Sequence, residues 1–368
     1  MAEMTKSKML EIVDSSIEKL ENKKFNVYFY VMDTKGNPSS ALEYIYKTAK
    51  TLFDKGYNVS MLHNEKEFIG VSEWLGEEYD KIQHHNIETE NIEIGPSDFL
   101  FIPEVFSNVM IQTKKLPCKR VILIQDYQKL NETMPISSTP DKLGITDAIV
   151  ITKEQERIIN DYFPSMRTHI VHPSIDKIFK RNDNPKNLVV NIISRNQSLI
   201  NNMIKPFYWK NPLYKWVSTR DMRGFSLEEY AEVLSNGAVT IWVDDDTKFG
   251  CTLLEALRSG TLVLAKVPNK PTEWMLDENG ELTKSIVWFD EIDDIPNILP
   301  SVIRSWTTNS VPKDVYETQK DFDSLYTEEQ QAAEIEEVYI NELFNRRLNE
   351  FKEVKTDIEN NVIKTKDE

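Results

Sequence analysis

The sequence predicts an α/β protein of two domains, each built on a parallel sheet covered by helices. Its 368 residues suffice for two domains of ordinary size. Short apolar runs of strand type alternate with amphipathic stretches of helical type, which is typical of parallel sheets with right-handed crossovers. The alternation stops at the polar stretch Lys180–Lys186 and then begins again. We therefore expect two Rossmann-like domains that bind ligands beyond the carboxyl ends of their strands.

The first alternating unit follows an N-terminal helix. Residues 4–22 place apolar side chains at helical spacing among mixed charges, which favours a helix packed at a domain edge over one lying on a membrane. A second helix is expected over Ala41–Lys55 and ends at Gly56. Strands are expected at Phe25–Met32, Tyr57–Leu62, Asp98–Ile102, Arg120–Gln125, Ala148–Ile151 and His169–Val171.

The second alternating unit has fewer strands and a helical ending. Strands are expected at Leu188–Ile193, Leu213–Ser218, Val239–Val243, Leu262–Ala265 and Ser285–Phe289, and helices at Ser226–Leu234 and Cys251–Arg258. Tyr316–Phe351 is rich in Glu and Lys and is expected to be helical, whereas Lys352–Glu368 is expected to fray. The domain plan is a helix over 1–24, domains over 25–183 and 184–312, helices over 313–351 and a charged tail over 352–368.

Composition narrows the class of partner and the compartment. The net charge of -16 disfavours nucleic acid, because duplex binding needs a basic surface. Two cysteines, Cys118 and Cys251, lie among apolar neighbours and form no disulfide framework, which favours buried thiols in a reducing compartment. No apolar run approaches the ~20 residues that cross a bilayer, and charged residues interrupt the N-terminal helix. We expect a cytoplasmic protein without a transmembrane segment.

The most informative segment is Arg223–Ala265, which reads as a strand, a glycine-containing loop and a helix N-terminus. Gly250 removes a side chain where a backbone must approach a ligand closely. The amides of Gly250, Cys251 and Thr252 would then face an anion such as a diphosphate, favoured by the helix dipole. Glu255, one turn into the helix, is placed to accept hydrogen bonds from a ribose diol. An ordinary crossover with Glu255 on a solvated face fits the same spacing equally well.

This segment resembles the nucleotide-sugar signature of the family-4 retaining glycosyltransferases. The matching residues are Phe249-Gly250, Leu254-Glu255-Ala256, Gly260 and Val263, in that order. Three further passages resemble the family: Ile151–Asp176, Asn187–Arg195 and Leu325–Tyr339. The resemblance spans about Phe25 to Leu343 and implies the GT-B fold, in which two Rossmann-like domains face a cleft and terminal helices cross back to the first.

The resemblance also implies roles for residues of the second domain. The family's ribose-binding glutamate falls on Glu255, and its glutamate that holds the donor sugar falls on Thr247, with Asp246 adjacent. Arg195 follows the first strand of this domain, where the family has a phosphate-binding arginine. The nearest candidate for the companion lysine is Lys205. The diphosphate contacts fall on the amides of Gly250, Cys251 and Thr252, and Phe249 of the motif is counted with the donor-binding residues.

Two acidic sites have alternative interpretations. Asp126 ends a strand where related enzymes carry a histidine near the sugar, and a helix N-cap explains it equally well. Asp244-Asp245-Asp246 resembles the metal-binding Asp-x-Asp of the other glycosyltransferase fold. The GT-B setting favours loop capping or a donor-sugar contact over metal. We therefore expect neither a metal nor a cofactor besides the nucleoside-diphosphate sugar itself.

The resemblance implies a hexosyl- or pentosyltransferase that retains anomeric configuration and needs no protein nucleophile. The acceptor stays open between a glycan, a lipid-linked sugar, a protein and a modified base. Thr247 in place of a glutamate leaves a second interpretation, a catalytically weak relative that binds nucleotide sugar or serves assembly. A nucleotide-sugar epimerase shares the architecture, and a phage-type DNA-base glycosyltransferase is disfavoured by the acidic charge.

Overall fold

The computed structural model describes residues 6–182, 185–244, 247–311, 315 and 319–360. Contacts between residues divide the chain into two compact units. Unit 1 comprises Met1–His172 and Gln331–Glu368, and unit 2 comprises Pro173–Gln330. The division after His172 falls earlier in the chain than the polar stretch that suggested a boundary in the sequence.

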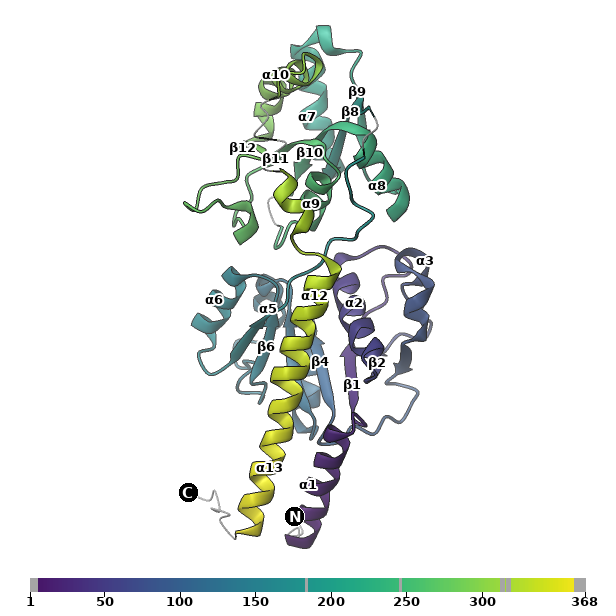
Figure 1. Cartoon of the computed structure of the whole chain (residues 1–368), viewed down its shortest axis with the longest axis vertical. Helices are drawn as coiled ribbons and strands as arrows, with labels where there is room; N and C mark the ends of the chain where they lie inside the picture. Colours follow the sequence, from purple (N-terminus) through teal and green to yellow (C-terminus); the bar gives the residue numbers. More distant parts are fainter. Residues whose placement is uncertain (1–5, 183–184, 245–246, 312–314, 316–318, 361–368) are drawn as a thin grey trace. The chain divides into compact units, whose positions relative to one another are not determined.

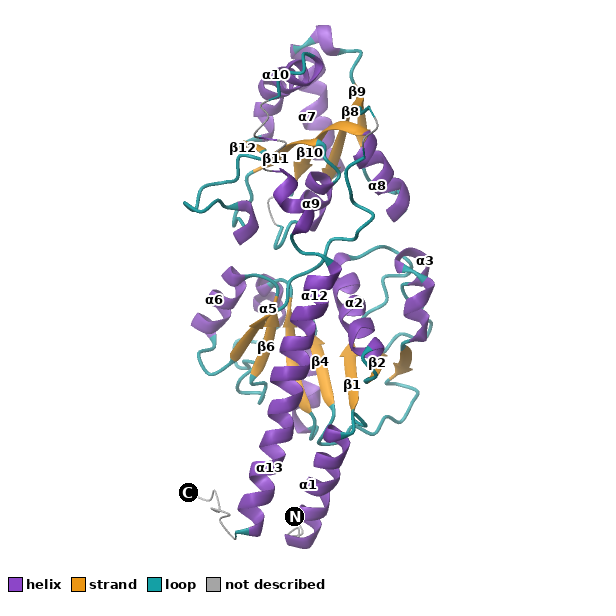
Figure 2. Cartoon of the chain, viewed as in Figure 1, coloured by secondary structure: helices purple, strands orange, loops and turns teal. Residues whose placement is uncertain are grey.

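Unit 1 contains a seven-stranded parallel sheet (Figures 1 and 2). The strands are β1 (Asn26–Tyr30), β2 (Asn58–His63), β3 (Gln83–Asn86), β4 (Phe99–Pro103), β5 (Lys119–Ile124), β6 (Asp147–Val150) and β7 (Arg167–Ile170), in the order β3-β2-β1-β4-β5-β6-β7. The connecting helices are α1 (Lys6–Glu21), α2 (Ser40–Asp54), α3 (Ser72–Leu75), α4 (Ser107–Gln112), α5 (Tyr127–Thr133) and α6 (Lys153–Tyr162). The central strand β4 is buried along its whole length, because helices cover both faces of the sheet.

One long C-terminal helical segment packs against the sheet of unit 1 (Figure 1). It consists of α12 (Glu328–Ile335), a π-helix (Glu336–Phe344) and α13 (Asn345–Glu359). The Phe344 ring lies 4.6 Å from that of Phe99 and 5.0 Å from that of Phe25, centroid to centroid. Helix α1 packs along α13, with ion pairs from Lys352 to Glu21 and from Lys355 to Asp14. These contacts make α1 a packing helix.

The start and end of this helical segment differ from the sequence expectation. The expected start at Tyr316 lies outside the described residues, and the described chain becomes α-helical only at Glu328. Tyr326 has a positive φ of 56°, which interrupts a helix before that point. The expectation of fraying from Lys352 is wrong up to Glu359, because Ile358 is buried and holds the last turns.

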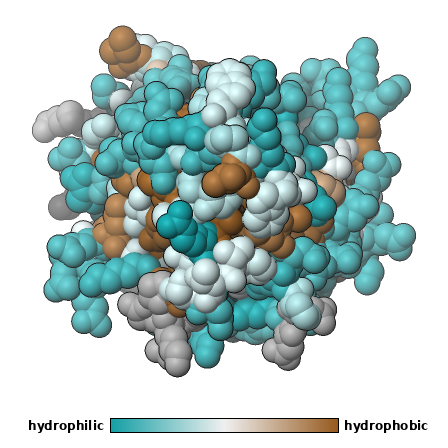
Figure 3. Space-filling view, turned by 90° about the horizontal axis from the view of Figure 1, so that it is seen from above, coloured by the Kyte–Doolittle hydropathy of each residue, from teal (hydrophilic) through white to brown (hydrophobic). Residues whose placement is uncertain are grey.

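Unit 2 contains a five-stranded parallel sheet in the order β12-β11-β10-β8-β9. The strands are β8 (Asn187–Ser194), β9 (Ser218–Asp221), β10 (Gly237–Val243), β11 (Leu262–Lys266) and β12 (Val287–Phe289), and the helices are α7 (Gln197–Lys210), α8 (Leu227–Asn236), α9 (Cys251–Arg258) and α10 (Ile295–Thr307). Strand β10 is wholly buried at the centre. Seen from above, brown and pale side chains form a band among hydrophilic ones (Figure 3).

The expected strand at Leu213–Ser218 is wrong. Pro212–Tyr214 forms a 3₁₀ turn, and the strand begins only at Ser218. The apolar residues that suggested a strand, Leu213 and Trp216, are exposed rather than paired in the sheet. Strand β3 is a further element that the sequence did not reveal, because its residues Gln-His-His-Asn form no apolar run.

Candidate functional site

The candidate site of unit 2 lies where the order of its strands reverses. Strand β8 comes first in the chain and has β9 on one side and β10 on the other. Ligands of doubly wound sheets bind at the carboxyl ends of the strands beside such a reversal. Arg195 directly follows β8 and Asp244 directly follows β10. Both residues therefore lie at the carboxyl ends of the strands that border this crevice.

Arg195 and Asp244 form an ion pair across that point. A guanidinium nitrogen of Arg195 lies 3.1 Å from a carboxylate oxygen of Asp244. The Arg195 side chain is 78% exposed, so water weakens the attraction and the pair contributes little to stability. The Arg195 guanidinium is therefore accessible to an incoming anion.

Gly250 adopts a conformation that only glycine enters without strain. Its φ of 85° and ψ of 38° are left-handed, and it precedes α9 as the N-cap. A Cβ atom there would lie 2.7 Å from Cε of Met275 and 3.1 Å from Cζ2 of Trp274. Backbone conformation and packing both require glycine at this position.

Two side-chain donors hold the peptide that precedes Gly250. Nε1 of Trp274 donates to the carbonyl oxygen of Phe249 at 2.7 Å, and the hydroxyl of Thr272 donates to the same oxygen at 3.3 Å. The Phe249 ring is buried and packs edge-on against Tyr326, with 4.9 Å between ring centroids. Phe249 thus fixes the loop from within instead of reaching outward to a ligand.

The N-terminus of α9 has the polarity that an anion requires. Gly250 has no side chain with which to cap α9, and its carbonyl accepts from the amides of Leu253 and Leu254. The hydroxyl of Thr252 accepts a 2.9 Å hydrogen bond from Nε1 of Trp242, which fixes the first turn against β10. The first amides of a helix carry a partial positive charge from the aligned peptide dipoles. The structure therefore brings Gly250, Cys251 and Thr252 together at the end of the central strand.

Glu255 lies one turn further along α9 and is half-buried. Burial, together with the negative charge of Glu255, raises the pKa of Tyr230 well above its ordinary value. Tyr230 lies on α8, and among the described residues its buried hydroxyl has no hydrogen-bond partner. A buried hydroxyl without a partner is costly, so this group is a candidate for contact with a bound molecule. Tyr230 could not be predicted as a site residue, because nothing in the spacing of the sequence links α8 to Glu255.

The other sequence candidates of unit 2 are placed less favourably. Thr247 is 8% exposed, so its side chain is largely covered. Asp246 lies outside the described residues. Lys205 is exposed in the middle of α7, about 12 Å along the helix axis from the first residue, Gln197. The structure therefore does not bring Lys205 beside Arg195 at the carboxyl edge.

In unit 1 the strand order reverses between β1 and β4. Asp126 follows the neighbouring strand β5 and is the N-cap of α5, where its carboxylate accepts from the amide of Gln128 at 3.0 Å. The N-cap role that the sequence left open is thus present. The amide of Asp126 in turn donates to a carboxylate oxygen of Glu104 at 2.9 Å.

Glu104 is a candidate that sequence reasoning missed. It directly follows β4, is 5% exposed, and lies at the carboxyl edge of the sheet. Burial raises its pKa to about 7, although the amides of Asp126 and Gln125 favour the charged form. A carboxyl group that titrates near neutral pH can exchange protons under physiological conditions. In the sequence, only the position of Glu104 directly after an apolar strand could have indicated a site residue.

A pair of histidines also lies near the carboxyl ends of β2 and β3. The Phe68 ring lies 4.3 Å from the His63 ring and 4.8 Å from the His84 ring, centroid to centroid. Burial, and then His63, lower the pKa of His84 to about 4, so His84 is neutral at pH 7. A hydroxyl of Tyr46 lies 3.4 Å from Nε2 of His84. His84 can therefore take part in hydrogen bonds without carrying a charge.

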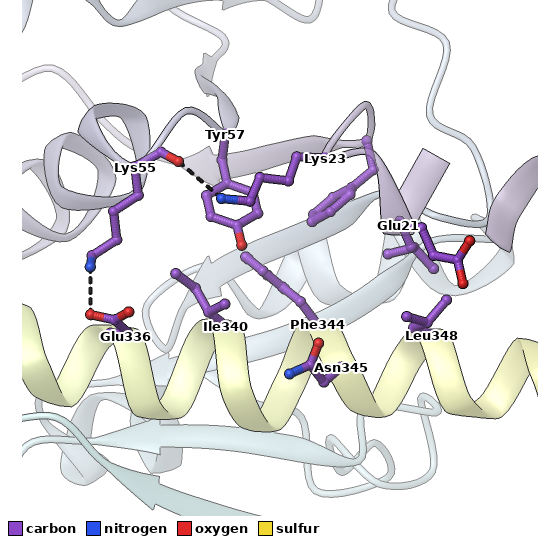
Figure 4. A pocket seen from close by; sticks show the side chains of 11 residues that line it. Glu21, Lys23, Lys55, Tyr57, Glu336, Ile340, Phe344, Asn345 and Leu348 are labelled. Atoms are coloured by element: carbon purple, nitrogen blue, oxygen red, sulfur yellow. Dashed lines mark hydrogen bonds and ion pairs between the residues drawn. The ribbon is translucent and has the colours of Figure 1, made fainter. Parts of the chain in front are cut away.

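A pocket of about 530 Å³ lies at the opposite edge of unit 1, by the amino ends of β1 and β2 (Figure 4). Phe25, Tyr57 and Phe344 form its aromatic wall. Lys55 pairs with Glu336 across its mouth at 2.5 Å. Because it lies away from the carboxyl edge, this pocket contains none of the site residues that the sequence suggested.

The part of the chain that the structure describes contains no cluster of three or more His, Cys, Asp or Glu side chains able to hold a metal ion. Asp245 and Asp246 lie outside that part, so the acidic run after β10 is represented by Asp244 alone. Asp244 pairs with Arg195. No described helix is long and apolar enough to cross a membrane.

The topology of both units defines the class of fold, and solved structures agree with it. Sucrose-phosphate synthase from Thermosynechococcus elongatus superposes with a TM-score of 0.61 at 10% identity, covering 88% of this chain and 100% of that one. WaaG, a glycosyltransferase involved in lipopolysaccharide biosynthesis, gives 0.53 at 11%, with 84% and 99% covered. The catalytic domain of starch synthase IV from Arabidopsis thaliana, bound to ADP and acarbose, gives 0.53 at 8%, with 88% and 99% covered.

The chain therefore has the GT-B glycosyltransferase fold, as the sequence predicted. No family model matches the sequence, and no curated protein matches it. At identities of 8 to 11%, the likeness concerns the fold. Activity has to be argued from the residues of the site.

Proposed function

We propose that this protein transfers a sugar from a nucleoside-diphosphate sugar to an acceptor, and that unit 2 binds the donor. One observation carries the proposal. Gly250, in a left-handed conformation with no room for a Cβ, starts α9 at the end of the central strand. It lies beside the reversal of strand order that Arg195 borders. Such a loop suits a diphosphate because backbone amides and an arginine can share its charge.

Each candidate residue has a proposed role in donor binding. The amides of Gly250, Cys251 and Thr252 and the guanidinium of Arg195 bind the diphosphate. The Glu255 carboxylate accepts hydrogen bonds from the ribose hydroxyls, and Thr247 or Asp246 contacts the donor sugar. Phe249 supports the loop through its buried ring and its anchored carbonyl.

The reaction itself requires no protein nucleophile. The bond between the anomeric carbon and the diphosphate oxygen breaks, and a bond from that carbon to an acceptor oxygen forms. The acceptor proton passes to the departing diphosphate, so atoms and charges balance. Attack from the face of the leaving group retains the anomeric configuration, as the family resemblance implies. We propose that neither a metal nor a further cofactor takes part, and that Asp126 lies on the acceptor side.

Thermal unfolding with a panel of nucleotides tests the donor site. ADP, UDP and GDP, and the corresponding nucleotide sugars, are added to the full chain. A donor at one hundred times its dissociation constant should stabilise the folded chain by about 2.7 kcal/mol and raise the melting temperature. ADP is a sensible first probe, since starch synthase IV was solved with it. If no nucleoside diphosphate raises the melting temperature, the proposal is wrong.

An arginine substitution locates the binding. Arg195→Ala should lower nucleotide affinity about tenfold or more, because a charge-assisted hydrogen bond to phosphate contributes about 1.5–3 kcal/mol. Arg157→Ala is the matched control, because Arg157 is 68% exposed and pairs with Glu154 at 2.9 Å in unit 1. Equal loss of affinity in both variants would argue against a phosphate contact by Arg195.

A second candidate function is a nucleotide-sugar-binding protein with weak or no transfer. Its supporting observation is Thr247, 8% exposed, at the position where the resemblance implies a sugar-holding glutamate. Product analysis by NMR separates the candidates. Donor binding with neither hydrolysis nor transfer over a panel of glycan and lipid acceptors supports the binding protein. Conversion of the donor sugar without any acceptor would instead indicate an epimerase.

The compartment follows from the thiols. Cys118 is buried, Cys251 is half-buried, and neither forms a disulfide bond. A reducing cytoplasm keeps such thiols unpaired, so we propose that the protein acts there.

A further inference from the structure

The surface at the C-terminal end of α7 combines large apolar side chains with lysines. Trp209 is 76% exposed, Leu213 is 85% exposed and Trp216 is 63% exposed. Lys210 and Lys215 lie between them in the sequence, Lys205 lies about one helical turn before Trp209, and all three lysines are exposed as well. We call these six residues the tryptophan–lysine surface.

The turn that carries this surface is firmly built, so the exposure of its side chains is not a sign of loose structure. Phe207 and Val217 are fully buried on either side of it. The hydroxyl of Tyr208 donates to the Val217 carbonyl at 2.6 Å and closes the turn. The hydroxyl of Tyr214 donates to the carbonyl of Pro300 at 3.2 Å, and Asn211 donates to that of Pro296 at 2.8 Å. These bonds anchor the turn to α10 and leave the two tryptophans and Leu213 pointing away from the core.

The charge of this stretch is opposite to that of the whole chain. The protein has 60 Asp and Glu against 44 Lys and Arg, yet residues 184–220 contain no acidic residue. The same residues include Lys186, Arg195, Lys205, Lys210, Lys215 and Arg220. Acidic residues adjoin this surface at one edge: Asp293 lines a hollow of about 480 Å³ with Trp209, Lys210 and two prolines, and the 3₁₀ turn Ile292–Asp294 contacts α7. Salt screens acidic charge beyond about 8 Å, so charges elsewhere on the chain act weakly here, and Lys205 and Lys215 do not line the hollow that contains Asp293.

We propose that the tryptophan–lysine surface binds the surface of an anionic lipid membrane without crossing it. Tryptophan rings favour the boundary between headgroups and acyl chains, and leucine favours the apolar side of it. Lysines around them attract anionic headgroups while their stems pack on the apolar side chains.

Other occupants fit this composition less well. Protein interfaces are enriched in tryptophan but depleted of lysine at their cores. Glycan-binding platforms use tryptophan for stacking but have no use for an aliphatic side chain as exposed as Leu213. The mixture of tryptophan, leucine and lysine is the one that membrane-surface segments share.

Vesicle sedimentation of the full chain tests the proposal. The probes are vesicles of phosphatidylcholine alone and of phosphatidylcholine mixed with phosphatidylglycerol. The chain should sediment with the mixed vesicles and not with the neutral ones, and added sodium chloride should release it. Failure to bind the mixed vesicles, or equal binding to both kinds, would overturn the proposal.

Two sets of substitutions separate the apolar and the charged contributions. Trp209→Ser with Trp216→Ser should weaken vesicle binding at least about tenfold, because two interfacial rings are lost. Lys205→Gln, Lys210→Gln and Lys215→Gln should each weaken it about fivefold. Ile136→Ser is the matched control, since Ile136 in unit 1 is fully exposed but belongs to no such group. Thermal unfolding of each variant checks that it is folded.

Each remaining outcome has a defined meaning. Vesicle binding that survives both sets of substitutions would overturn the assignment to this surface. Retention on immobilised glycans, or a dimer that the tryptophan substitutions dissociate, without vesicle binding, would assign the surface to another occupant. Because nucleotide binding by the same variants is measured separately, loss of membrane binding can be distinguished from failure of the donor site.

Discussion

The two sheets of this protein have the same kind of strand reversal but surround it with different chemistry. In unit 2 the reversal is bordered by backbone, with Gly250 before α9 and an exposed ion pair between Arg195 and Asp244. In unit 1 it is bordered by Glu104, a buried carboxyl group whose pKa burial raises to about 7. The first arrangement suits a fixed anion, and the second suits a proton that moves. The fold alone therefore does not decide what each half can do.

The largest expected effect tests the glycine of unit 2. Gly250→Ala should destabilise the chain by about 4 kcal/mol, from backbone strain and from overlap with Met275 and Trp274. Gly224→Ala is the control, because Gly224 also has a positive φ of 81° but its Cβ would meet nothing within 4 Å. It should cost only about 1–2 kcal/mol. Urea unfolding measures both, and equal losses would show that packing at Gly250 does not matter.

The next effect tests the buried carboxyl group of unit 1. The folded pKa of Glu104, about 7, exceeds the ordinary value of 4.5, so the folded chain holds a proton that the unfolded chain has lost. Stability from this group is therefore present below pH 4.5 and is lost as the pH rises to 7. The loss amounts to roughly 3 kcal/mol.

Glu104→Gln should remove this pH dependence, because an amide does not titrate. Relative to the parent chain, the variant should gain stability between pH 4.5 and pH 7.5. Urea titrations at both pH values measure the difference, with the exposed Glu132→Gln as control. A stability difference between Glu104→Gln and parent that stays constant with pH would contradict a pKa near 7.

Inner and edge strands of the two sheets differ in how well the sequence predicts them. The inner strands were predicted because their residues are apolar throughout, as in β4 and β10. The edge strands β3 and β9 were not predicted, because their residues, such as Ser218–Asp221, are mostly polar, whereas the edge strands β7 and β12 contain apolar residues and were predicted. Leu213 and Trp216 suggested a strand because they are apolar, but both are exposed. We propose that their apolar character serves membrane contact instead.

The candidate site was predictable only in part. Gly250 followed from the motif, since a glycine before a helix implies a special backbone conformation. Glu104 and Tyr230 did not follow, because their environments depend on burial by residues far away in the chain. A single sequence shows which side chains are titratable but does not show which of them the fold buries.

A smaller effect is expected at Tyr230. Its hydroxyl is buried without a partner among the described residues, so Tyr230→Phe should leave the free chain equally stable or more stable by about 1 kcal/mol. If the hydroxyl contacts the bound donor, the same variant should show a smaller rise in melting temperature with nucleotide. Tyr208→Phe is the control, because that hydroxyl has a partner in the Val217 carbonyl and its loss should destabilise. Unchanged nucleotide response in Tyr230→Phe would exclude the contact.

The smallest effect concerns the ion pair that distinguishes unit 2. Asp244→Asn should change the free energy of unfolding by no more than about 1 kcal/mol, because its partner Arg195 is 78% exposed. Nucleotide affinity should nevertheless rise about threefold, since the diphosphate no longer competes with a carboxylate for the guanidinium. Isothermal titration with ADP at low and high salt measures this change in affinity.

The double variant tests whether the two residues act through one contact. When Arg195→Ala is already present, adding Asp244→Asn should no longer change the nucleotide affinity. If the gain persists without Arg195, the carboxylate repels the nucleotide directly and the guanidinium is not the phosphate ligand.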